Sequence, residues 1–183
     1  MLKPTVLFPI NKVWHYSLSL FLVFALYVVI TTIAWNSYRI IPAPDVTFMT
    51  LKGEKIALKN LRGKPVLVTF WATDCPSCVK EVNDFVDLYQ QFHSKGLEII
   101  AVAMVYDPPN HVVEMTQAKQ IPYFVALDLQ AKHALAFGKI EFTPTTFLIN
   151  PAGQIVFSKI GRFDFEDMKH RLHNFYQEQS NVA

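Results

Sequence analysis

The sequence has very little cysteine. Its 183 residues include only two, Cys75 and Cys78, which stand three positions apart. A disulfide scaffold spreads its cysteines so that they close long loops, and two neighbouring cysteines cannot do this. A tetrahedral zinc site needs about four ligands, and two thiols supply only half of them. Redox chemistry at the two sulfur atoms is therefore the leading interpretation.

The chain also lacks a strong charge of either sign. Seventeen basic residues against fifteen acidic ones leave a formal net charge of +2. This balance gives no reason to expect nucleic acid or a strongly anionic substrate as a partner. Neither an internal repeat nor a low-complexity segment is present. The length therefore predicts one folded domain with a short appendage.

One stretch near the N-terminus has no charged residue. Between Lys12 and Arg39 there is no Asp, Glu, Lys or Arg, and Ser17 to Trp35 is a run of 19 mostly apolar residues. As a helix this run would measure about 28 Å, close to the roughly 30 Å hydrocarbon core of a bilayer. We expect one uncleaved transmembrane helix, with residues 14–38 in the membrane and aromatic residues at both interfaces. A cleaved signal peptide is the alternative, but its apolar run is usually shorter.

The positive charges around this run indicate an orientation. Lys3 and Lys12 precede it, whereas only Arg39 follows closely, which favours a cytoplasmic N-terminus and places the rest of the chain outside. We therefore divide the sequence into a cytoplasmic tip and anchor at 1–39, a proline-containing tether at 40–45 and a folded domain at 46–183.

The folded domain alternates apolar strands with helices. Strands are expected at residues 46–49, 55–58, 66–71, 97–105 and 123–127, and a hairpin at 145–149 and 154–160. Helices are expected between the cysteines and Gly96, and at residues 111–120, 130–137 and 165–177. Continuous apolar strands between helices predict an α/β fold whose mixed central sheet carries helices on both faces.

The two cysteines stand where a strand ends and a helix begins. Pro76 suits the first helical turn, where its missing N–H costs nothing. The sulfur of Cys75 would then lie beside the unsatisfied N–H groups of the helix start, which favour the nucleophilic thiolate. Cys78 lies within one turn, so the pair can open and close a disulfide without a large backbone movement. An inert buried pair and a copper(I) site remain alternatives.

Two motifs resemble a known family. The segment Phe70–Glu81, FWATDCPSCVKE, resembles the active site of thioredoxin-like proteins, particularly the membrane-anchored TlpA/ResA group. Thr143–Ile149, TPTTFLI, matches the family's cis-proline loop and the strand after it, and the resemblance extends over residues 42–178. It implies a thioredoxin-like fold and a thiol–disulfide oxidoreductase that needs no cofactor and no metal.

The resemblance also assigns roles. It makes Cys75 the exposed attacking thiol and Cys78 the buried resolving thiol. It makes Pro144 a cis residue whose loop faces the cysteines, with the backbone of Thr143 offered to a bound client strand. Trp71 would pack beside the disulfide.

Three positions bear on the thiols or depart from the pattern. Glu81 matches an acidic residue that lies near the thiols in this group, and a solvated helix carboxylate is the alternative. Thr69 stands where thioredoxin has a buried Asp. Asp74 stands where the family often has an aromatic residue, and a carboxylate there should oppose ionisation of Cys75. Both carboxylates favour a reductant over a strong oxidant.

The resemblance implies partners and a location. The clients would be proteins with disulfides, such as apocytochrome c or copper-site assembly proteins. Electrons would come from an integral-membrane thiol donor that draws on cytoplasmic thioredoxin. The protein would span the bacterial inner membrane once, with its catalytic domain on the periplasmic side.

Three other functions are compatible with parts of the sequence. A copper(I) carrier would add a histidine ligand to the two thiols, for which His111 and His133 are available. A thiol peroxidase would need Thr three residues before its reactive cysteine, but Thr73 is only two before Cys75. A non-catalytic anchored binding module is the third possibility. The remaining candidate metal pair, His170 and His173 on the last helix, is expected to be solvated.

Overall fold

The computed structural model describes residues 20–32 and 41–180. The chain divides into a unit at Met1–Ile40 and a compact unit at Ile41–Ala183. In the first unit, residues 20–32 form a helix whose side chains are mostly exposed and apolar. No helix in the described parts of the chain is both long enough and apolar enough to cross a membrane. The structure therefore does not support the predicted transmembrane helix, although residues 14–19 and 33–38 of the predicted membrane segment lie outside the described ranges.

A six-stranded mixed sheet forms the centre of the second unit. Its strand order is β1 (Ile41–Pro42), β8 (Gln154–Ile160), β7 (Thr145–Ile149), β4 (Val66–Trp71), β5 (Glu98–Ala103) and β6 (Phe124–Leu127). The pairs β4–β5 and β5–β6 are parallel, and the other neighbours are antiparallel. A separate hairpin joins β2 (Thr47–Met49) to β3 (Lys55–Ala57). The predicted mixed sheet is confirmed. The predicted tether differs in part, because its residues Ile41 and Pro42 form β1.

Helices connect the strands. These are η1 (Leu58–Leu61), α2 (Pro76–Phe92), η2 (His93–Lys95), α3 (Pro109–Ala118), α4 (Lys132–Ala136) and α5 (Phe165–Ser180). The segment formed by α2 and η2 ends at Gly96, whose φ of +107° is the left-handed geometry that favours glycine. Strand β5 stops two residues before the predicted end, because the backbone turns at Met104.

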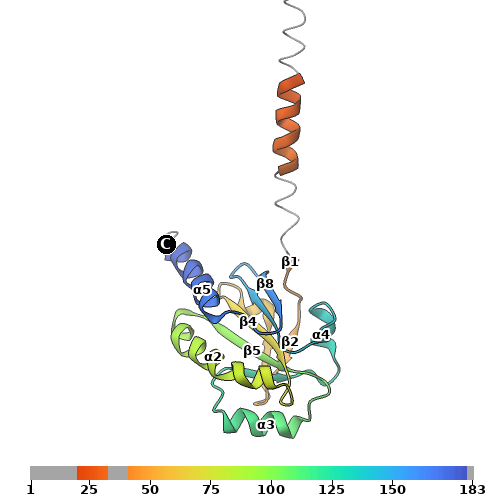
Figure 1. The fold of residues 1–183 in the computed structure, drawn as a ribbon, viewed down its shortest axis with the longest axis vertical. Coiled ribbons are helices and arrows are strands. Elements are labelled where there is room, and N and C mark those ends of the chain that lie inside the picture. The colour runs from red at the N-terminus through yellow and green to blue at the C-terminus, as the bar shows by residue number, and fades with distance from the viewer. Residues whose placement is uncertain (1–19, 33–40, 181–183) are drawn as a thin grey trace, which may run out of the picture. The chain divides into compact units, whose positions relative to one another are not determined.

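The sheet separates two apolar layers. Side chains of β4 alternate: Leu67 and Trp71 face the layer of α2 and α5, whereas Val68 and Phe70 face the layer of β2 and α4. Figure 1 shows α2 and α5 on one side of the strands and α4 on the other. The predicted placement of helices on both faces is confirmed. Strands β4, β5 and β7 are buried along their whole length because an apolar layer covers each face of the sheet.

The topology brings three connections to one edge of the sheet. Strand β4 ends at Trp71, and its parallel neighbour β5 ends beside it at Ala103. Antiparallel β7 begins at the same edge, with Thr145 opposite Phe70. The segment after β4, the loop after β5 and the loop before β7 therefore meet there.

Candidate active site

A disulfide lies at this edge, at the start of α2. The Sγ atoms of Cys75 and Cys78 are 2.11 Å apart. Cys75 is the N-cap of α2, and its Sγ accepts a hydrogen bond from the backbone N–H of Cys78 at 3.2 Å. The hydroxyl of Ser77 lies 3.3 Å from the same sulfur. Pro76 occupies the first turn as predicted. These donors and the helix dipole favour a thiolate at Cys75 once the disulfide is reduced.

The two sulfurs differ in accessibility. Cys75 keeps 9% of its surface exposed, against 3% for Cys78. An incoming thiol or disulfide therefore reaches Cys75 first. This order agrees with the predicted attacking and resolving roles, which stay predictions.

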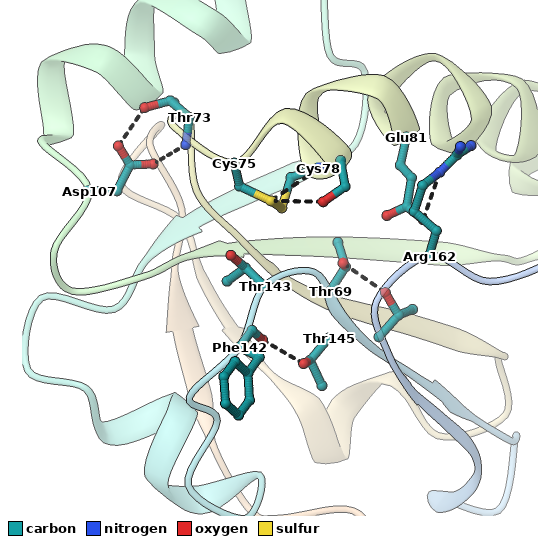
Figure 2. Close-up of a disulfide and its surroundings, with 12 residues drawn as sticks. Thr69, Thr73, Cys75, Cys78, Glu81, Asp107, Phe142, Thr143, Thr145 and Arg162 are labelled. Carbon is teal, nitrogen blue, oxygen red and sulfur yellow. Dashed lines mark hydrogen bonds and ion pairs between the residues drawn. A yellow bond between two sulfur atoms is a disulfide. The ribbon is translucent and has the colours of Figure 1, made fainter.

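The loop before β7 faces the disulfide. The peptide bond between Thr143 and Pro144 is cis, as predicted. Pro144 lines a small cavity together with Cys78 and Trp71. Figure 2 shows Thr143 between the disulfide and the rest of this loop. The hydroxyl of Thr145 donates to the carbonyl of Phe142 at 2.6 Å, which holds the loop against the strand.

Two neutral polar side chains, Thr69 and Trp71, lie in the core beneath the disulfide. Thr69 is buried, and its Oγ1 lies 2.9 Å from Oγ1 of Thr146, so the two hydroxyls share a hydrogen bond. At Thr69, where the resemblance expects a buried Asp, the structure therefore has a hydroxyl paired with a second hydroxyl. Trp71 is buried in the same apolar cluster as both cysteines, as the resemblance implied. Its Nε1 has no hydrogen-bond partner among the described residues.

Glu81 is the buried carboxylate of the site. Only 1% of it is exposed, and it lines the same small cavity as Cys78 and Pro144. Glu81 therefore lies beside Cys78, as the resemblance implied, and the alternative of a solvated helix carboxylate is wrong. Burial raises the pKa of Glu81 to about 7, and nearby Asp84 adds to this effect, while the Arg162 guanidinium opposes it. The carboxyl can therefore gain or lose a proton near neutral pH.

Asp74, the other acidic residue predicted at the site, differs from Glu81 in its exposure to solvent. Asp74 is exposed on the surface immediately before Cys75. It remains a charge adjacent in sequence to the attacking sulfur.

Two residues near the site were missed from the sequence. Asp107, in the loop after β5, is buried and accepts hydrogen bonds from the backbone N–H and the hydroxyl of Thr73, at 2.7 and 2.6 Å. Arg162, after β8, places Nε 3.7 Å from Oε1 of Glu81. An Asp in the short segment between a buried strand and a pair of prolines was an available signal for the first. Nothing local marked the second, because Arg162 is distant from Glu81 in the sequence.

The histidines weighed as metal ligands do not join the thiols. His111 is exposed on α3, and the ring of His133 packs 4.7 Å from that of Phe48, in the layer opposite the cysteines. On α5, His170 and His173 are exposed, as expected. Within the described ranges, no group of three or more His, Cys, Asp or Glu side chains is arranged to hold a metal ion.

Comparison with known proteins gives the same chemistry. The sequence model of the Redoxin family matches residues 41–172. A thiol–disulfide oxidoreductase ResA of Bacillus cereus is 33% identical over 136 residues, which cover 74% of this chain and 75% of the relative. ResA of Bacillus subtilis (strain 168) is 35% identical over 114 residues, covering 62% and 63% of the two chains.

Solved structures share the fold. A thiol:disulfide interchange protein of the thioredoxin family from Chlorobium tepidum TLS has a TM-score of 0.69 at 26% identity, and the match covers 75% of this chain and 97% of that one. StoA from Bacillus subtilis has a TM-score of 0.60 at 29% identity, covering 70% and 98%. These matches cover between 62% and 75% of this chain.

Proposed function

The chain belongs to the Redoxin family as a thioredoxin-like thiol–disulfide oxidoreductase of the TlpA/ResA type, and from this premise we propose that it reduces disulfides in client proteins. The observation that carries the proposal is the disulfide of Cys75 and Cys78 at the start of α2, opposite the cis-proline loop. Such a pair can accept or release two electrons while the backbone around it stays in place.

The proposed reaction consists of two exchanges. The Cys75 thiolate attacks one sulfur of a client disulfide, forms a mixed disulfide and releases the other client sulfur as a thiolate. The Cys78 thiol then loses its proton and attacks Cys75, which frees the second client sulfur. The client gains two electrons and two protons, and the enzyme ends with its own disulfide. A dithiol donor reverses that oxidation and restores both thiols.

Two carboxylates support the reducing direction. Asp74 is adjacent to Cys75, and Glu81 is buried against the cavity that Cys78 lines. Negative charge near a thiolate destabilises it, and a less stable reduced form gives a more negative reduction potential. We expect the potential, measured against glutathione or dithiothreitol, to be more negative than roughly −200 mV. A value near roughly −120 mV, which strong oxidants have, would reject the reducing direction.

We extend the proposal to the type of client. Proteins that bind haem or copper through cysteine must present reduced thiols, so proteins of cytochrome c maturation or copper-site assembly are the clients proposed here. The support is the resemblance to the TlpA/ResA group. A Cys78→Ser variant cannot resolve the mixed disulfide and should hold clients on Cys75, where mass spectrometry identifies them. Recovery of clients without paired cysteines would reject this assignment.

We also propose a location and an electron source. Residues 14–38 would attach the protein to the inner membrane with the catalytic domain outside, and an integral-membrane thiol donor would reduce it. The 19-residue apolar run from Ser17 to Trp35 and the distribution of basic residues around it support this location. After reduction of intact cells, a membrane-impermeant maleimide should label Cys75. Labelling that occurs only after lysis would reject the orientation.

A further inference from the structure

One loop contacts both segments that flank the disulfide. Asp107 accepts two short hydrogen bonds from Thr73, which stands two residues before Cys75. The preceding residue, Tyr106, places its hydroxyl oxygen 3.5 Å from Oγ1 of Thr143, in the cis-proline loop. Figure 2 shows the pair of Thr73 and Asp107 on one side of the disulfide and Thr143 below it. We name residues Val105–Pro108 the bridging loop.

The two segments have little else to fix their separation. The backbone pairing of β4 with β7 ends at Phe70 opposite Thr145. Beyond that pair, no backbone hydrogen bond in the described part of the chain joins residues 72–75 to residues 142–144. Client binding needs both at once, because the client's disulfide reacts at Cys75 while its backbone lies along Thr143. The distance across this gap therefore depends on side-chain contacts.

The bridging loop is stiff enough to set that distance. The backbone N–H of Met104 donates to the carbonyl of Trp71 at 3.0 Å, which ties the start of the loop to β4. The backbone N–H of Asp107 donates to the carbonyl of Met104 at 3.0 Å and closes a turn. Pro108 and Pro109 follow, and each fixes its own φ. The positions of Tyr106 and Asp107 are thereby coupled.

The hydrogen bonds at the two ends of the bridging loop differ in strength. Asp107 is buried and ionisable, and hydrogen bonds to such a carboxylate are roughly twice as strong as neutral ones. Tyr106 is 55% exposed, and its neutral contact with Thr143 is at the long limit of a hydrogen bond. The first contact suits a permanent attachment. The second suits a contact that a client can replace.

We propose that the bridging loop positions the two sides of the client cleft. Asp107 holds the segment that carries Cys75, and the ring of Tyr106 packs against an extended client segment lying along Thr143. Exposed Val105 extends this apolar surface, which fits a client with an apolar side chain beside its reacting cysteine. Asp107 acts as a positioning residue through Thr73, whereas Tyr106 contacts the client directly as a binding residue. This inference rests on the proposed reduction of protein disulfides.

The Asp107 end is tested against a matched buried carboxylate. Asp128 is also buried and accepts two backbone hydrogen bonds, from His133 and Ala134 at 3.1 and 2.8 Å, but these belong to α4. We expect Asp107→Ala to lower kcat/KM roughly 10-fold for both insulin and bis(2-hydroxyethyl) disulfide, because Cys75 is misplaced for either. Asp128→Ala should lose comparable thermal stability and stay within about twofold of the wild type on both substrates. Equal activity losses in the two variants would overturn the role of Asp107.

A conservative variant keeps this test usable if Asp107→Ala does not fold. Asp107→Asn retains one acceptor oxygen for Thr73, so its kcat/KM should lie between those of Asp107→Ala and the wild type. The rate of Cys75 alkylation as a function of pH should change with Asp107→Asn and not with Asp128→Asn. An unchanged alkylation profile for Asp107→Asn would contradict the proposal.

The Tyr106 end is tested by comparing substrates. We expect Tyr106→Ala to raise KM for insulin roughly fivefold more than KM for the small disulfide, which has no backbone to lie along Thr143. Tyr106→Phe should keep most of the wild-type KM, because the ring remains. Leu135→Ala, at an exposed apolar residue of α4, is the control and should change neither KM. Equal KM changes on both substrates would overturn the inference. A wild-type protein that reduces neither substrate would instead reject the proposed function.

Discussion

Arg162 places its Nε atom 3.7 Å from Oε1 of Glu81, so that a guanidinium from the loop after β8 meets a buried carboxylate on α2. The two side chains differ in environment: 51% of the Arg162 side chain is exposed, against 1% for Glu81. The same guanidinium also lies 3.4 Å from the carboxylate of Asp84. Arg162 is therefore shared between a half-exposed carboxylate, Asp84, and the buried carboxylate of the redox site, and its removal should affect both.

Removal of the Arg162 charge should raise the pKa of Glu81 further. Burial already raises that pKa to about 7, and the Arg162 guanidinium opposes the rise, together with a backbone hydrogen bond from Phe163. In Arg162→Gln the opposing charge is absent, so the carboxyl should titrate above its wild-type value. Carbon-13 NMR of the side-chain carboxyl measures this directly. Arg171→Gln is the control, because Arg171 pairs with Asp167 on α5 and not with Glu81. An unchanged titration in Arg162→Gln would show that the ion pair has no influence.

Glu81 should make the folded domain less stable at higher pH. Its pKa is about 7 when folded and 4.5 in its ordinary state, so folding takes up a proton between these values. The penalty is absent below about pH 4.5, grows as the pH rises and is complete above about pH 7, where it reaches about 3 kcal/mol. Urea unfolding of Glu81→Gln should therefore show higher stability than the wild type at pH 8, with the difference shrinking towards pH 5. The exposed control Glu54→Gln should show no such trend, and a difference independent of pH would contradict the assignment.

The hydroxyl pair beneath the disulfide predicts a non-additive result. Thr69→Val leaves the hydroxyl of Thr146 buried without its partner, at a cost of about 1–3 kcal/mol. Thr146→Val should cost a similar amount for the same reason. The double variant removes both polar groups, and its loss of unfolding free energy should be smaller than the sum of the two. Additive losses in chemical denaturation would mean that the two hydroxyls do not depend on one another.

Ser77 should influence the reactivity of the attacking sulfur. Its hydroxyl lies 3.3 Å from Sγ of Cys75 and can donate to the thiolate after reduction. Ser77→Ala removes that donor while the backbone N–H of Cys78 remains. We expect roughly tenfold slower alkylation of reduced Cys75 by iodoacetamide at pH 7, since a hydrogen bond to a charged group contributes about 1.5–3 kcal/mol. Ser94→Ala, outside the site in η2, is the control. Equal rates for Ser77→Ala and the wild type would exclude this contribution.

The sequence predicted the parts of the site whose signals are local. The apolar run Val66–Trp71 has the same bounds as β4, and Pro76 marks the start of α2. The cis bond before Pro144 came from the family resemblance and not from local physics. Motifs of this kind indicate a strand, a helix start and a loop geometry without any knowledge of distant contacts.

The environment of Glu81 could not be predicted in the same way. A carboxylate on a helix is usually exposed, and only the packing of α2 against the sheet and the approach of Arg162 make this one buried. Asp107 is a similar case, because it lies in the loop after β5 whereas its partner Thr73 lies in the segment after β4. The resemblance placed Glu81 near the thiols, but its burial, its contact with Arg162 and the role of Asp107 depend on long-range pairings that the local sequence does not reveal.

The pairing of β4 with β7 implies that, during synthesis, the two cysteines can meet before the opposing loop is in place. Cys75 and Cys78 are near neighbours, so they can meet as soon as their own segment has been synthesised. Thr145 pairs with Phe70 only after the polypeptide has been extended far beyond both cysteines. A nascent chain that stops short of Thr143 thus already carries an oxidisable dithiol but not the opposing loop. Its two thiols can therefore react with small-molecule oxidants before the cleft that selects a client has formed.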